Sequence, residues 1–281
     1  MKTLVTGATG RVGSRFVPRL LQAGERVKVL ARDAGRAGFL RERGAELVVG
    51  DLRDPEALDR AVAGVEVVIH LGATFRGGVA EEEVVEVNRT ATDALARAVL
   101  AAGVRRFVFA STNLVYGPGR GRPAQEDDPP APAGAYPASK VAAEEGLLAL
   151  HRSDGLDVRI VRLAFVYGDG DPHLAESLRW AGAWPSHKRL HLVHHADVAQ
   201  ALVLAARAEG VDGRTFNAAD DAPVTALELH RLNGVPVPDG AEARTLEDPW
   251  EGIVDSTTIR RVLGFRPVHP TVYAAAAAGA L

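Results

Sequence analysis

Three glycines directly follow a short apolar segment at the start of the chain, and this spacing restricts the possible folds more than any other feature. Residues 2–6 predict a buried strand, and a helix is expected over residues 13–23; between them runs Gly7-Ala8-Thr9-Gly10-Arg11-Val12-Gly13. Gly7 permits a tight turn, Gly10 lets the backbone approach a phosphate, and Gly13 lets the helix pack closely on the strand. The free N–H groups at the helix start would hold the anion. A glycine-rich turn without a ligand is the alternative, but its place in the first strand–helix unit favours a pyrophosphate site.

The rest of the chain continues this alternation of strands and helices. Strands that are apolar almost throughout, as strands covered on both faces should be, are expected over residues 2–6, 26–30, 45–49, 65–70, 106–110 and 158–163. Helices are expected over residues 13–23, 54–63, 83–102, 138–153 and 197–209, with shorter ones over 224–232, 257–263 and 274–278. This pattern predicts an α/β protein with a doubly wound parallel sheet, the Rossmann fold.

The same pattern divides the chain into two parts. Residues 1–165 are expected to form a dinucleotide-binding domain to which residues 190–220 return. Residues 166–189 and 221–281 are expected to form a small C-terminal α/β lobe that binds the substrate.

The composition excludes several classes of protein. The chain has 33 Lys and Arg against 36 Asp and Glu, a net charge of −3, which excludes nucleic-acid binding by bulk charge. It has no cysteine, which excludes disulfides, thiolate metal sites and a cysteine nucleophile. The histidines between residues 173 and 195 show no metal-ligand spacing, so no metal site is predicted. Because there is neither a signal peptide nor a run of about 18 apolar residues, we expect a cytoplasmic protein with no membrane or nucleic-acid partner.

The end of the second predicted strand bears on the choice of cofactor. An acid at this point accepts hydrogen bonds from a free ribose 2′-hydroxyl, whereas an arginine suits a 2′-phosphate. Ala31 stands where the acid is expected and Arg32 follows it. Arg11 of the glycine turn is expected to favour the same cofactor, the one with a 2′-phosphate. NADP is therefore favoured, and the alternative is NAD with Asp33 as the ribose acid.

Tyr136 and Lys140 are four residues apart at the start of a predicted helix, so their side chains share one face. A tyrosine with its ordinary pKa near 10 transfers protons poorly at neutral pH. Lowering that pKa by about 3 units corresponds to roughly 4 kcal/mol of preferential stabilisation of the phenolate. We expect Lys140 and a cationic nicotinamide ring to supply it together. The alternative is an ordinary pair on a helix surface.

Together with the segment Ala110-Ser111-Thr112-Asn113-Leu114-Val115-Tyr116-Gly117, these features resemble an extended short-chain dehydrogenase/reductase of the NAD-dependent epimerase/dehydratase family. Further matches lie at residues 68–73, 87–90, 162–168, 193–199 and 255–267. The resemblance implies that Thr112 binds the substrate oxygen, that Tyr136 transfers the proton, and that Lys140 holds the nicotinamide ribose. With the glycine turn, it implies cofactor contacts at Gly7, Thr9, Gly10, Arg11, Val12, Gly13, Arg32, Asp51, Leu52, Leu71, Gly72, Ala73, Asn88, Ala110, Tyr136, Lys140, Leu163, Phe165 and Val166.

The resemblance also helps to choose among activities. Dehydratases of the family carry an acidic pair where this chain has Asn113 and Leu114, so a dehydratase is not expected. Leu190 stands where epimerases that bind nucleotide diphosphates carry an arginine. We therefore expect hydride transfer between nicotinamide and a ketone or secondary alcohol, with Phe165, Trp180 and Trp184 as pocket walls. A nucleotide-sugar epimerase that retains NAD is the first alternative, and an NADP-binding redox sensor without catalysis is the second.

Family members usually form homodimers through two long helices, which here match residues 83–102 and 138–153. The resemblance therefore implies a homodimer. Its contact would be made by Leu95, Val99, Val141 and Leu148.

Overall fold

Seven parallel strands form the central sheet, in the order β10-β6-β5-β4-β1-β2-β3. The computed structural model describes residues 1–75 and 79–281. The strands are β1 (Lys2–Thr6), β2 (Arg26–Ala31), β3 (Glu46–Val49), β4 (Val67–His70), β5 (Arg106–Thr112), β6 (Val158–Leu163) and β10 (Arg214–Ala218). The predicted Rossmann fold is confirmed, with strands running outwards from β1 on one side and from β4 on the other. Strand β10 was not predicted, because its sequence Arg-Thr-Phe-Asn-Ala is too polar to stand out as a buried strand.

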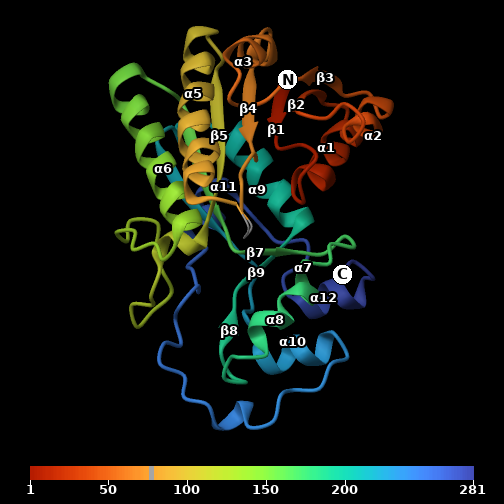
Figure 1. Cartoon of the computed structure of the whole chain (residues 1–281), viewed down its shortest axis with the longest axis vertical. Coiled ribbons are helices and arrows are strands. Elements are labelled where there is room, and N and C mark those ends of the chain that lie inside the picture. The colour runs from red at the N-terminus through yellow and green to blue at the C-terminus, as the bar shows by residue number, and fades with distance from the viewer. Residues whose placement is uncertain (76–78) are drawn as a thin grey trace.

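Helices cover both faces of this sheet because successive strand residues point to opposite sides. Val5 belongs to the core under α1 (Gly13–Gln22) and α9 (His195–Arg207). Its neighbour Leu4 belongs to the core under α3 (Pro55–Val62), α5 (Ala91–Ala101) and α6 (Ala135–Asp154). The short helix α2 (Gly38–Glu42) adjoins α1. Figure 1 shows α5 and α6 side by side on one flank, with α1 and α2 on the other.

The helix predicted over residues 83–102 is instead three segments in sequence. These are α4 (Glu81–Val85), a π-helical turn η1 (Glu86–Thr90) and α5. Asn88 lies in the π-helical turn and is almost fully buried, with its side-chain amide bonded to Thr74 and Ser139. A π-helical turn adds one residue to a helix and is frequent at functional sites.

A buried ion pair holds α6 over strand β6. The Arg162 guanidinium contacts the Glu144 carboxylate at 2.6 Å, and both side chains are buried. Arg162 also donates a hydrogen bond of 2.8 Å to the hydroxyl of Tyr116, which in turn donates to Asn217 at 2.7 Å. These contacts fix the helix whose first two turns carry Tyr136 and Lys140.

A smaller lobe lies at the end of the sheet where the strands have their carboxyl ends (Figure 1). It contains two short strand pairs, β7 with β9 and β8 with β11, and its own apolar core. Its elements are β7 (Phe165–Tyr167), α7 (His173–Glu176), α8 (Leu178–Ala181), β8 (Arg189–Leu190), β9 (Leu192–His194), β11 (Val224–Thr225), α10 (Ala226–Leu232), η3 (Ala241–Ala243) and α12 (Val272–Ala277). Helix α11 (Thr257–Leu263) lies in the sequence range expected for the lobe but packs against α9 and β10.

Two of the residues expected at a dimer contact are part of the core. Leu95 and Val99 are fully buried between α5 and the sheet of the same chain, so they cannot meet a partner subunit. Val141 and Leu148 are partly buried. The homodimer itself stays a prediction. Within the described part of the chain, no helix has the length and apolar character needed to span a membrane.

Candidate active site

Two cavities adjoin each other at the carboxyl ends of the strands, and they share Gly7, Gly10 and Ala73. The smaller, of about 180 Å³, lies beside the ends of β2 and β3. It is lined by the predicted cofactor residues Gly7, Thr9, Gly10, Arg32, Asp51, Leu52, Gly72 and Ala73. The larger, of about 450 Å³, lies between the sheet and the small lobe. It is lined by the predicted residues Gly7, Gly10, Arg11, Val12, Gly13, Leu71, Ala73, Ala110, Thr112, Tyr136, Lys140, Leu163, Phe165 and Val166.

The glycine turn has the geometry that close backbone packing requires. Gly7 has a φ of +67°, which glycine adopts without strain, and a Cβ atom there would lie 2.6 Å from the backbone nitrogen of Gly72. A Cβ atom at Gly13 would lie only 2.2 Å from the carbonyl oxygen of Gly7. Gly10 donates its backbone N–H to the same oxygen at 3.0 Å. The turn is therefore a cradle of bare backbone at the start of α1, which suits a pyrophosphate.

Two arginines, Arg32 and Arg36, line the smaller cavity. The Arg32 side chain is 70% exposed and lies 4.0 Å from the Asp51 carboxylate. Asp51 is held mainly by Arg53, whose hydrogen bond lowers the pKa of Asp51 to about 2. Arg36 was missed by the sequence reasoning, although it stands only four residues after Arg32 in the turn that follows β2.

The NAD alternative proposed Asp33 as the ribose acid. In the structure, the Asp33 carboxylate is hydrogen-bonded within its own turn. It accepts the backbone N–H groups of Gly35 at 2.8 Å and Arg36 at 3.1 Å. Asp33 is not among the described residues that line either cavity. The cap of α3 is Asp54, whose side chain accepts the N–H of Glu56.

The three predicted catalytic residues come together in the larger cavity. Thr112 ends β5, while Tyr136 and Lys140 lie in the first turns of α6. The Thr112 hydroxyl oxygen accepts the backbone N–H of Leu114 at 3.2 Å, which leaves its hydrogen free to donate. Ser111 also lines this cavity, and its buried hydroxyl has no hydrogen-bond partner among the described residues.

Burial governs the electrostatics of the tyrosine and the lysine. It raises the pKa of the Tyr136 phenol well above its ordinary value. The expected lowering of this pKa requires a cationic nicotinamide ring as well as Lys140, so it stays a prediction. Burial also lowers the pKa of Lys140 to about 7, an effect that the nearby Glu144 carboxylate partly opposes. The Lys140 ammonium lies 3.9 Å from the centre of the Phe109 ring, and Lys140 itself is only 2% exposed. A lysine buried this deeply carries its charge only partly at neutral pH.

Asn88 is the one predicted cofactor residue that is not among the described residues lining either cavity. Its side-chain oxygen accepts the N–H of Thr74 at 2.7 Å, and its amide nitrogen donates to the Ser139 hydroxyl at 3.0 Å. The Ser139 hydroxyl in turn donates to the carbonyl oxygen of Tyr136 at 2.7 Å. Asn88 therefore reaches the site indirectly, by joining the segment after β4 to the first turn of α6.

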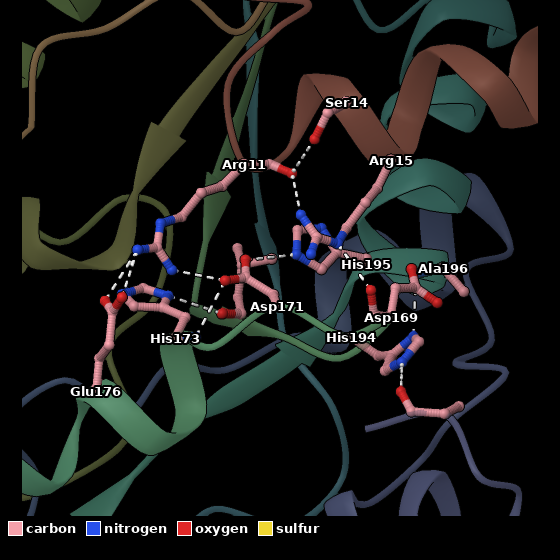
Figure 2. A network of polar contacts seen from close by, with 12 residues as sticks. Arg11, Ser14, Arg15, Asp169, Asp171, His173, Glu176, His194, His195 and Ala196 are labelled. Atoms are coloured by element: carbon pink, nitrogen blue, oxygen red, sulfur yellow. Dashed lines mark hydrogen bonds and ion pairs between the residues drawn. The ribbon is translucent and has the colours of Figure 1, made fainter. Parts of the chain in front are cut away.

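Arg11 was expected to favour a 2′-phosphate together with Arg32, but its side chain points towards the small lobe (Figure 2). One of its terminal nitrogens lies 2.6 Å from Asp171, and the other lies 2.9 Å from both carboxylate oxygens of Glu176. Asp171 is buried and also accepts a hydrogen bond of 3.0 Å from the His195 ring. Burial alone would raise the pKa of Asp171, but the His195 hydrogen bond and the Arg11 charge lower it to about 2.

Two further arginines extend this connection along α1. Arg15 donates to the carbonyl oxygen of Asp169 at 3.1 Å, and Arg19 contacts the Asp169 carboxylate at 2.6 Å. Asp169 has a φ of +54°, a conformation that residues other than glycine rarely adopt. Residues 11, 15 and 19, spaced by four along the glycine turn and α1, therefore anchor the small lobe to the dinucleotide-binding part.

Several side chains of the larger cavity were not predicted from the sequence. Phe75, Leu114, Leu190 and Asp171 all line it, as does His173. The sequence had suggested His173 as a residue of the substrate cleft. Of the three aromatic residues expected as pocket walls, Phe165 lines the cavity. Trp180 and Trp184 are not among the described residues that line it. The Trp180 ring stands nearly perpendicular to the Phe165 ring, at 6.2 Å between ring centres.

The sequence of the chain is similar to those of known enzymes. The model of the NAD-dependent epimerase/dehydratase family matches residues 3–219. A ketoreductase from Stigmatella aurantiaca, named for 4-hydroxy-2-methyl-3-oxo-4-farnesyl-3,4-dihydroquinoline-1-oxide, is 30% identical over 236 residues, which cover 80% of this chain and 70% of the relative. A UDP-glucose 4-epimerase from Halalkalibacterium halodurans is 28% identical over 97% of this chain and 92% of its own length.

Among solved structures, the dTDP-glucose 4,6-dehydratase of Streptomyces venezuelae with NAD bound has a TM-score of 0.79 and is 27% identical to this chain. The match covers 95% of this chain and 92% of the dehydratase. Reductases, epimerases and dehydratases are thus all found among the similar proteins.

Proposed function

The chain belongs to the NAD-dependent epimerase/dehydratase family, and we propose that within it this protein is an NAD(P)-dependent oxidoreductase that interconverts a ketone and a secondary alcohol. The observation that carries the proposal is that Thr112, Tyr136 and Lys140 line one cavity together with the glycine turn. The similar ketoreductase from Stigmatella aurantiaca supports the same choice.

Each of the three side chains has a chemical part in the reduction of a ketone. The raised pKa of Tyr136 keeps its phenol protonated at neutral pH, which is the state that can donate a proton to a carbonyl oxygen. The free hydrogen of the Thr112 hydroxyl would bind the same oxygen as charge develops on it. Lys140 would hold the nicotinamide ribose. When bound, the nicotinamide supplies the hydride that adds to the carbonyl carbon.

The residues next to Thr112 argue against elimination of water, which needs an acid to protonate the leaving hydroxyl group. Asn113 is buried, and its side-chain amide donates to the carbonyl oxygen of Gly252 at 2.7 Å. Leu114 offers only an alkyl group. Epimerisation is the remaining alternative, supported by the likeness to UDP-glucose 4-epimerase over 97% of the chain.

Replacing the phenol tests the catalytic assignment. Tyr136→Phe should lower kcat for ketone reduction by about 10²- to 10⁴-fold, the range typical of a lost general acid, while the affinity for the reduced cofactor stays measurable. The matched control is Tyr273→Phe, because Tyr273 lies on α12, where its hydroxyl contacts Glu228. Consumption of the reduced nicotinamide, followed by its absorbance, measures turnover. Undiminished kcat in Tyr136→Phe would contradict the proposal.

We further propose that NADP is the preferred cofactor. Arg32 and Arg36 both line the smaller cavity and could bind a 2′-phosphate, whereas Asp33 is engaged with the backbone of its own turn. Loss of a hydrogen bond to a charged group is worth about 1.5–3 kcal/mol, so Arg32→Ser should weaken NADPH binding roughly 10- to 150-fold and leave NADH binding nearly unchanged. Arg41→Ser on α2 is the control. Tighter binding of NADH than of NADPH by the unaltered protein would refute this choice.

A further inference from the structure

The cavity that contains Tyr136 has an apolar entrance. Phe75 and Leu114 both line it and remain 45% and 44% exposed, although most large apolar side chains of the chain are buried. The Phe75 ring meets the Tyr136 ring edge-on, with 4.5 Å between ring centres. Leu190 and Phe165 line the same cavity from the small lobe. Exposed apolar surface around a catalytic residue favours a ligand that covers it with hydrocarbon.

The cationic side chains that line this cavity in the described part of the chain are already engaged with other groups. Among the described residues that line it, the arginine and lysine side chains are those of Arg11 and Lys140. Arg11 contacts two carboxylates, those of Asp171 and Glu176 (Figure 2). Glu176 also lies 3.8 Å from the Arg179 guanidinium. A second anion placed beside Arg11 would meet those carboxylates. Lys140 is buried below Tyr136 and has a pKa lowered to about 7 by burial.

Lys188 and Arg189, two cations of the small lobe, contact other parts of the lobe. Lys188 contacts the Glu251 carboxylate at 2.5 Å. Arg189 donates to the carbonyl oxygen of Pro249 at 2.9 Å, and its guanidinium lies over the Trp250 ring. These residues are engaged outside the described lining of the cavity.

Arg244 is engaged in the same way. It donates to two carbonyl oxygens, those of Gly182 at 2.7 Å and Trp184 at 2.9 Å. A nucleoside diphosphate carries at least two negative charges and would find these guanidinium groups already engaged in part with backbone carbonyl oxygens.

Given the proposed ketone reduction, on which this step rests, we propose that the substrate is an uncharged ketone with a long alkyl or aryl group rather than a nucleotide sugar. The carbonyl oxygen lies at Thr112 and Tyr136, and the hydrocarbon part lies against Phe75, Leu114, Phe165 and Leu190. Each methylene of the substrate that leaves water then raises the affinity about three- to fourfold, because its transfer free energy is favourable.

Equilibrium binding tests the proposal without requiring turnover. The protein is saturated with NADP⁺, and the series 2-butanone, 2-hexanone and 2-octanone is titrated by calorimetry, with UDP as the competing class of ligand. Because NADP⁺ and ketone are both oxidised, no hydride moves between them. We expect affinity to rise about three- to fourfold per methylene and UDP not to bind. Tight binding of UDP, equal affinities along the series, or no binding of any ketone would each overturn the proposal.

Two variants of exposed residues test whether the alkyl chain of the ketone contacts Leu114. Leu114→Gln should weaken 2-octanone binding several-fold more than 2-butanone binding, because the longer chain makes more use of this side chain. Val268→Gln is the control, since Val268 is 61% exposed and is not among the described residues lining the cavity. Equal losses in the two variants would contradict the assigned contact. Ketones that bind with the expected gradient but are never reduced would refute the proposed reaction and leave the ligand class standing.

Discussion

Lys140→Met should make the protein more stable while it removes activity, and the size of the gain should depend on pH. Lys140 is 2% exposed, and burial lowers its pKa from 10.5 to about 7, with the Glu144 charge partly opposing the shift. This shift means that the charged ammonium destabilises the folded protein by roughly 5 kcal/mol. A methionine of similar length fills the same space without a charge.

The direction of the pH dependence follows from the lowered pKa. Below pH 7 the lysine is protonated in both states, so the folded protein bears the whole penalty of the buried charge. Between pH 7 and pH 10.5 the unfolded chain still binds the proton and the folded chain does not, so the free energy of unfolding rises with pH. The advantage of the methionine variant should therefore be largest below pH 7 and should shrink by about 1.4 kcal/mol per pH unit above it.

Urea denaturation of both proteins at a series of pH values measures this difference directly. Subtracting the two curves cancels every other titrating group that the substitution leaves alone. Lys140→Arg is the control, because arginine stays charged across this range and its difference from the methionine variant should not vary with pH. Parallel stability curves for the unaltered protein and Lys140→Met would refute the reasoning, since they would mean that residue 140 keeps its charge in the folded state.

Three further substitutions test the framework of the site. Glu144→Gln should lower the free energy of unfolding by about 3–5 kcal/mol in urea, because it leaves the Arg162 guanidinium buried without a counter-charge. The double variant Glu144→Leu/Arg162→Met should lose much less, and equal losses would speak against a charge effect. Gly13→Ala should abolish NADPH binding, followed by cofactor fluorescence, because its Cβ atom would lie 2.2 Å from the Gly7 oxygen; unchanged affinity would contradict the close packing. Asp54→Ala should lower stability by about 1 kcal/mol through loss of the α3 cap, and no change in the urea midpoint would show that the cap contributes nothing.

The features that the sequence determined are those that depend on neighbouring residues. The strand Lys2–Thr6 and the strand Val158–Leu163 match the prediction because continuous apolar runs bounded by polar segments are local signals. The glycine turn and the spacing of Tyr136 and Lys140 are equally local, and the structure brings both to one cavity.

Tertiary structure decided whatever depends on a partner far away in the chain or on depth of burial. Arg11 turns to the small lobe because Asp171, 160 residues later in the sequence, offers it a buried carboxylate. The pKa of Tyr136 is raised because the fold shields the phenol from water, an effect that no spacing in the sequence encodes. Local sequence thus set the backbone and the order of the chemical groups, whereas their charge states and directions arose from contacts that exist only once the chain has folded.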